Sequence, residues 1–110
     1  MLFGEKMNLT DALVLPRTGK VLKNRTVLAA MTNKQSHENG ILSEEEKKWL
    51  IRRAKGDFGI ITTAATNVSA EGQGWEGEFG VYDDIHIVDL EKLTTTIHQT
   101  DSIILSLIHI

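Results

Sequence analysis

The segment Gly72-Gln73-Gly74-Trp75-Glu76-Gly77 has the G-x-G-x-x-G spacing of glycine-rich loops that bind dinucleotides. In such loops the glycines follow a strand directly and open a helix whose N-terminal amides hold the pyrophosphate. Here the preceding apolar run ends several residues earlier, and no helical pattern follows Gly77. Glu76 and Glu78 would also place negative charge beside a phosphate. The sequence therefore predicts a loop at the end of a strand, and a dinucleotide site is the disfavoured alternative.

The other groups that could do chemistry are widely spaced. The chain has no cysteine. It has four histidines, His37, His86, His98 and His109, and no two of them have the i, i+4 spacing of helical metal sites. Asp83 and Asp84 could form an acid–base cluster with His86, but aspartates ahead of a helix are more often N-caps. We therefore expect neither a metal centre nor thiol chemistry, and we expect these aspartates to cap a helix.

A short series of strands and helices must position these groups. Apolar and β-branched runs predict strands over 26–31, 58–63 and 102–108. Helical signals lie between them, from 43 to 55 and from Asp83 or Asp84 onwards. Strands that alternate with helices predict an α/β fold in which the strands pair in parallel through right-handed crossovers.

The first helix has recognisable signals at both ends. Ser43 and Glu46 have the Ser-x-x-Glu spacing of a capping box, and Gly56 stands where a left-handed residue ends many helices. We expect its basic residues to form a solvated face: Lys47, Lys48, Arg52 and Arg53. We expect the second helix to bury one stripe of apolar residues: Ile87, Leu90, Leu93 and Ile97.

Composition narrows the class of protein. The chain has 110 residues, of which 41% are hydrophobic and 25% charged, as in an ordinary globular domain. A net charge of −3 argues against a nucleic-acid partner, because such modules carry a basic patch. No apolar run approaches the roughly 18 residues that span a bilayer, and the N-terminus does not have the pattern of a signal peptide. We therefore expect a cytoplasmic protein without a membrane partner.

Five segments combine into a more specific pattern. In order along the chain they read LKNR, VLAAMT, RRAKGDFGIIT, VSAEGQG and GVYDDIHI, at residues 22–25, 27–32, 52–62, 68–74 and 80–87. Together they resemble the old yellow enzyme family of FMN-dependent NAD(P)H:flavin oxidoreductases and ene-reductases. The resemblance implies the N-terminal part of a (β/α)₈ barrel, with residues 1–25 as an N-terminal arm and 26–110 as the first βα units. A turn or hairpin is expected in the arm, at 17–20.

The resemblance also implies a cofactor and a reaction. In the family, FMN sits at the C-terminal mouth of the strands, takes hydride from NADH or NADPH and passes it to an electron-poor small molecule such as an activated alkene. Six residues of this chain fall at positions that line the flavin: Ala29, Ala30, Met31, Thr32, Ala65 and Ser106.

The resemblance gives these six residues different parts. Backbone groups of Ala30 and Met31 would contact the flavin ring, and the Thr32 hydroxyl would bond near its C4 carbonyl. Ala65, expected just after the second strand, would let the ring approach closely. Ser106 stands where the family has a glutamine, and its side chain is too short for the same bidentate contact.

The chain is too short for a complete barrel, because such a barrel takes about 250 residues and this chain has 110. The family's substrate-binding histidine pair, proton-donating tyrosine and FMN phosphate site all belong to later strands, so the resemblance implies no catalytic residue in this chain. We therefore expect a barrel truncated after its third strand and inactive by itself. The alternative is a non-enzymatic α/β module that oligomerises or binds a partner through open sheet edges.

Overall fold

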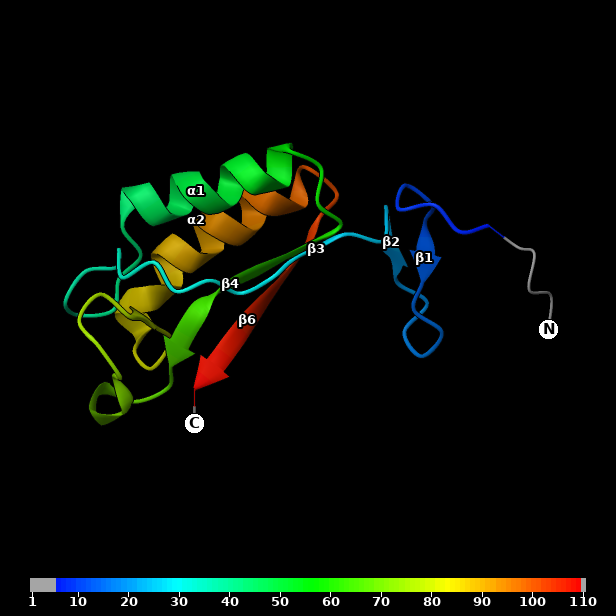
Figure 1. The fold of residues 1–110 in the computed structure, drawn as a ribbon. Helices are drawn as coiled ribbons and strands as arrows, with labels where there is room; N and C mark the ends of the chain where they lie inside the picture. The colour runs from blue at the N-terminus through cyan, green and yellow to red at the C-terminus, as the bar shows by residue number, and fades with distance from the viewer. Residues whose placement is uncertain (1–5, 110) are drawn as a thin grey trace.

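The computed structural model describes residues 6–109, which form a sheet covered by two helices and an N-terminal hairpin beside it (Figure 1). The elements in chain order are β1 (Leu13–Val14), β2 (Val21–Leu22), β3 (Val27–Leu28), α1 (Glu44–Lys55), β4 (Ile60–Asn67), β5 (Phe79–Gly80), α2 (Ile87–His98) and β6 (Ile103–His109). Two short 3₁₀ turns, Ala70–Gly72 and Asp84–His86, precede β5 and α2.

The main sheet is parallel throughout, as the alternation of strands and helices predicts. β4 lies at its centre and pairs with β3, β5 and β6. The first strand is shorter than expected, because the chain leaves the sheet after Leu28 and runs towards the loop that precedes β5. β4 continues to Asn67, four residues beyond the expected end, and the short strand β5 is absent from the sequence prediction.

Both helices pack on one face of the sheet (Figure 1). Leu50 of α1 and Leu93 and Ile97 of α2 are buried against Leu28 and Ile61 of the strands. The carboxyl end of β6 is not covered in this way. Alternate side chains of a strand point to opposite faces, yet residues 105–108 are all exposed. Among the described residues, β6 pairs only with β4, so its outer edge and both of its faces are open there.

The ends of α1 differ from the expectation in two details. The Ser43 hydroxyl accepts a hydrogen bond from the amide of Glu46 at 3.1 Å, as a capping box requires. The Glu46 side chain does not complete the box, because it turns inward and meets the Ser36 hydroxyl. Gly56 is not left-handed (φ −76°); the left-handed residue is Asp57 (φ 80°), whose amide bonds to the Ala54 carbonyl.

The second helix also departs from its expected pattern. Asp83 caps the 3₁₀ turn ahead of α2, as predicted, by accepting a hydrogen bond from the amide of Ile85. Leu93 and Ile97 are buried and Leu90 is partly buried, but Ile87 is 54% exposed. Ile87 is the first residue of α2 and lies outside the buried cluster, so its position in the sequence pattern overstated its burial.

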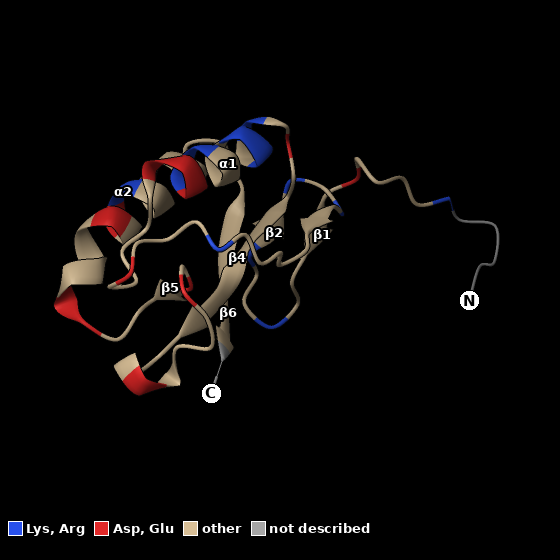
Figure 2. Ribbon diagram, turned by 60° about the vertical axis from the view of Figure 1, so that its left-hand side comes forward, with Lys and Arg blue, Asp and Glu red and all other residues tan. Residues whose placement is uncertain are grey.

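The basic face of α1 is only partly solvated. Figure 2 shows its acidic first turn and basic last turn, an arrangement that suits the helix dipole. Arg52 is exposed and Arg53 lies over the ring of Trp49. Lys47 is buried, contrary to the expectation, because its ammonium group pairs with Asp89 of α2.

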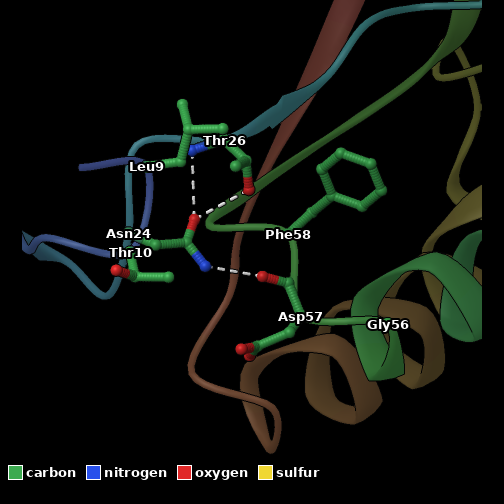
Figure 3. A pocket seen from close by; sticks show the side chains of 7 residues that line it. All are labelled: Leu9, Thr10, Asn24, Thr26, Gly56, Asp57 and Phe58. Atoms are coloured by element: carbon green, nitrogen blue, oxygen red, sulfur yellow. Dashed lines mark hydrogen bonds between the residues drawn. The ribbon is translucent and has the colours of Figure 1, made fainter.

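The N-terminal arm folds as expected into a hairpin, in which β1 and β2 pair antiparallel. Asn24 fastens the chain after the hairpin to the main sheet (Figure 3). Its Oδ1 accepts hydrogen bonds from the amide and hydroxyl of Thr26, at 3.1 and 2.8 Å, and its Nδ2 donates to the Asp57 carbonyl at 2.6 Å. Lys23 adds a hydrogen bond to the Thr100 carbonyl, so the arm is held at the amino ends of the strands.

Neither of the two α-helices in the described part of the chain could cross a bilayer, since each has only 12 residues.

Candidate functional site

The candidate site lies where the parallel strands end. Because β3, β4 and β6 run the same way, their carboxyl ends meet at one edge of the sheet (Figure 1). All six residues expected near a flavin lie at or close to this edge: 29–32 follow β3, while Ala65 and Ser106 lie in β4 and β6. The register places Ala65 opposite Leu107, so Ala65 and Ser106 occupy neighbouring strands.

The segment 29–33 presents unpaired backbone. Ala29, Met31 and Thr32 are exposed and Ala30 is half-buried. These residues belong to no strand, and none of them takes part in the backbone hydrogen bonds that fix the neighbouring turns. Free peptide groups are strong donors and acceptors, so this segment can bind a polar ligand through its backbone.

The carboxyl half of β4 is irregular and built from small residues. The register of its pairing with β6 shifts between Thr62 and Ala65. Ala64 and Ala65, which lie at this shift, are buried. Such bulges re-aim side chains and are common beside active sites. Ala65 was expected after the strand but lies inside it, because β4 extends to Asn67.

Ser106 belongs to a cluster of three hydroxyl groups across β4 and β6. Its oxygen lies 3.0 Å from that of Thr66 and 3.2 Å from that of Thr63. Thr63 and Thr66 are buried and lie 2.9 and 3.0 Å from the Ala64 carbonyl oxygen, whereas Ser106 is exposed. Sequence reasoning missed both threonines, although hydroxyl residues at the end of an apolar strand are a usable signal.

The chain after segment 29–33 is anchored to the loop that precedes β5 and to β5 itself. The Ser36 amide donates to the Gly77 carbonyl at 3.1 Å, and the Gly80 amide donates to the Gly40 carbonyl at 2.9 Å. Gly77 has φ +81° and lies so close to Lys34 that a Cβ atom there would overlap its carbonyl. The two segments therefore form one unit at the carboxyl edge of the sheet.

His86 links the chain after segment 29–33 to the turn that follows β5. Its Nδ1 accepts a hydrogen bond from the Asp83 amide at 3.2 Å, so in the neutral ring the proton is on Nε2. Nε2 lies 2.8 Å from the Asn39 carbonyl oxygen and donates to it, and the Tyr82 hydroxyl donates to the same oxygen at 3.2 Å. His86 is therefore occupied by structural bonds. Among the described residues, no group of three or more His, Asp or Glu side chains could hold a metal ion.

The glycine-rich segment does not form a nucleotide loop. The residues after Gly77 enter β5 rather than a helix, and the Gly74 amide already donates to a carboxylate oxygen of Glu78 at 2.6 Å. A phosphate would have to compete with this buried carboxylate for the amide.

Glu46 of α1 is a buried acid in contact with the chain that follows segment 29–33. Its side chain is fully buried, and this desolvation raises the pKa of its carboxyl group. The Ser36 hydroxyl and the Asn33 side chain act in the opposite direction on that pKa. A proton can therefore reside on Glu46 at a higher pH than on an ordinary glutamate.

Comparison with known proteins matches nearly the whole chain to one family. The sequence model of the NADH:flavin oxidoreductase / NADH oxidase family matches residues 17–110. A probable NADH-dependent flavin oxidoreductase of Bacillus subtilis is 36% identical over 81 residues, covering 74% of this chain and 22% of that protein. A probable flavin mononucleotide-dependent alkene reductase of Leishmania infantum is 30% identical over 91 residues, covering 83% of this chain and 24% of that protein.

Solved structures agree on the fold. The old yellow enzyme homologue from Zymomonas mobilis superimposes with a TM-score of 0.82 at 24% identity, covering 93% of this chain and 28% of that one. This likeness confirms the expected fold class, an incomplete (β/α)₈ barrel that contains about three of its strands. The chain spans about a quarter of the length of the curated relatives that it matches.

Proposed function

Because the chain belongs to the NADH:flavin oxidoreductase / NADH oxidase family, we propose that it forms one wall of an FMN site in an NAD(P)H-dependent oxidoreductase. The observation that carries this proposal is the unpaired backbone of 29–33 at the same sheet edge as Ala65 and Ser106. When bound, FMN supplies hydride transfer between NADH or NADPH and an electron-poor small molecule such as an activated alkene.

The residues at this edge fit a flavin in both shape and chemistry. A flavin ring has flat apolar faces and an edge of carbonyl and N–H groups. The alanines at 64 and 65 add little bulk beside β3, and the exposed backbone of 29–33 offers donors and acceptors on one side of β4. The exposed Ser106 hydroxyl offers another group on the other side.

Each residue then has a defined part in the proposed site. Ala29, Ala30 and Met31 hold the ring through backbone groups, and the Thr32 hydroxyl stabilises negative charge at the ring's carbonyl edge. Ser106 donates its hydroxyl proton towards the ring while Thr63 and Thr66 hold its oxygen in place. In this proposal the 110 residues position the cofactor and are inactive by themselves.

Titration with FMN tests this proposal. Quenching of FMN fluorescence should reveal binding by the purified chain, and Thr32→Val should weaken it by about threefold to tenfold, as expected for one hydrogen bond. Thr95→Val is the matched control, because Thr95 is exposed on α2. Absence of binding up to about millimolar FMN, or an unchanged affinity in Thr32→Val, would contradict the proposed site.

A turnover assay tests the inactivity. With FMN, an activated alkene and either NADH or NADPH, the chain should oxidise the nicotinamide no faster than free FMN does. Faster oxidation that depends on the alkene would show that the 110 residues contain a complete catalytic site.

The open edge of β6 supports a second proposal, self-association. Leu105, Leu107 and Ile108 are each 44–50% exposed on a strand that has no described partner on its outer side. Apolar open edges favour pairing with another strand. Light scattering after size exclusion should show oligomers that Leu107→Lys dissociates, whereas Val14→Lys in the hairpin should leave them intact. A monomeric wild-type chain would rule this proposal out.

A further inference from the structure

Glu46 is a buried acid that helix capping does not explain. The carboxylates of Glu44 and Glu45, in the same first turn of α1, face solvent, and Glu44 pairs with Lys47. Ser43 already caps the helix. Glu46 is fully buried and takes part in none of the ion pairs found among the described residues. Burial of a carboxyl group without a cation is costly, so the fold must gain something from it.

The side chain of Glu46 reaches the chain that follows β3. Its Oε2 is hydrogen-bonded to the Ser36 hydroxyl, while the Ser36 amide donates to the Gly77 carbonyl at 3.1 Å. Ser36 is itself buried, so it is held between α1 on one side and the loop before β5 on the other. The Asn33 side chain, whose hydrogen bond lowers the pKa of Glu46, belongs to the same stretch of chain after β3 as Ser36.

Ser36 is the first residue after the unpaired stretch whose backbone is hydrogen-bonded to another segment. Segment 29–33 leaves the sheet after Leu28 and has no strand partner of its own. Its course is therefore fixed by its two ends, namely the pairing of Leu28 with Ile61 and the anchor at Ser36.

We propose that Glu46 is a positioning residue: by holding Ser36, it fixes the path of Ala29–Thr32 along the carboxyl end of β4. This inference rests on the proposed function in so far as Ala29–Thr32 contact FMN. Glu46 touches neither cofactor nor substrate, and it acts through the segment that does.

Hydrogen exchange on the whole chain, without FMN, tests the anchor. Glu46→Ala should lower the protection of the Ser36 amide by about tenfold or more, while the amides in the middle of α2 change far less. Glu46→Gln keeps a group that can bond to the Ser36 hydroxyl and should restore most of the protection. Glu45→Ala is the matched control on the same helix turn, and Ser36→Ala should add little to the loss caused by Glu46→Ala.

The FMN titration then tests the consequence for the site. Glu46→Ala should weaken FMN binding by about tenfold, Glu46→Gln by less than about threefold, and Glu45→Ala not at all. Equal Ser36 protection in wild type and Glu46→Ala, or local loosening that leaves FMN affinity unchanged, would overturn the inference. If the wild-type chain binds no FMN, the proposed function fails, and the exchange experiment alone decides whether Glu46 anchors the segment.

Discussion

The ammonium nitrogen of Lys47 lies 2.6 Å from a carboxylate oxygen of Asp89, and this pair joins α1 to α2 on the outer layer of the fold. Both side chains are largely shielded, at 10% and 22% exposure. The hydrogen bonds that Lys47 donates to Asp89 and Glu44 raise its pKa despite the opposing effect of burial. The two helices are therefore tied by a charge pair as well as by apolar packing.

Removal of either partner should destabilise the protein. A double-mutant cycle with Lys47→Met and Asp89→Asn should give a coupling energy of about 1 kcal/mol, between the values typical of exposed and buried pairs. Because the pKa of Lys47 is raised in the folded state, this contribution is present below the ordinary lysine value of 10.5 and is lost as pH rises through the folded value. Urea unfolding at neutral pH measures the coupling, and Lys48→Met is the exposed control. A coupling near zero would contradict a stabilising pair.

Local sequence signals predicted the helices and the parallel order of the strands, and the family comparisons confirm the resemblance to old yellow enzymes. Strand lengths could not be predicted in the same way, because β3 ends at Leu28, inside the apolar run, where the chain leaves the sheet on its way to the contact between Ser36 and α1. Glu46 fits a capping box by spacing alone, yet its side chain finds a partner ten residues earlier in the chain. Contacts of this kind have no local signature in the sequence.

Some features of the candidate site could likewise be predicted from the sequence and others could not. Their common edge follows from parallel pairing, which the pattern of elements predicts. The cluster of Thr63, Thr66 and Ser106 depends on a bulge in β4, and no residue type marks that bulge in the sequence. The roles of Ala29–Thr32, Ala65 and Ser106 towards a flavin stay predictions.

The pH dependence of stability should show the titration of Glu46. Burial raises its pKa above the ordinary value of 4.5. A carboxyl group whose pKa is higher in the folded state contributes stability below its ordinary pKa and loses it as pH rises through the folded value. As pH rises from 4.5 through the folded pKa of Glu46, the free energy of unfolding of Glu46→Gln should therefore fall less than that of wild type. Glu45→Gln should follow wild type. Identical profiles for all three proteins would contradict a raised pKa.

Asn24 should be among the most sensitive polar residues outside the candidate site. Replacement by alanine removes two hydrogen bonds from Thr26 and one to the Asp57 carbonyl, and the bond to Asp57 joins the N-terminal arm to the turn before β4 (Figure 3). Asn24→Ala should lower the free energy of unfolding by about 2 kcal/mol, because buried donors and acceptors lose their partners. Asn8→Ala, at an exposed position in the same arm, should have almost no effect. Equal urea midpoints for the two variants would show that the arm contributes little to stability.

His86 and Tyr82 bond to the same carbonyl oxygen, that of Asn39, and this shared acceptor predicts unequal effects of their removal. His86→Phe keeps an aromatic ring but removes both hydrogen bonds of this buried side chain, to the Asp83 amide and to the Asn39 carbonyl, so it should cost about 2 kcal/mol. Tyr82→Phe leaves the carbonyl bonded to His86 and should cost less than about 1 kcal/mol. His98→Phe, at an exposed position, is the control for the change of residue type. If urea unfolding gives His86→Phe and Tyr82→Phe the same cost, His86 is not the main link between these two segments.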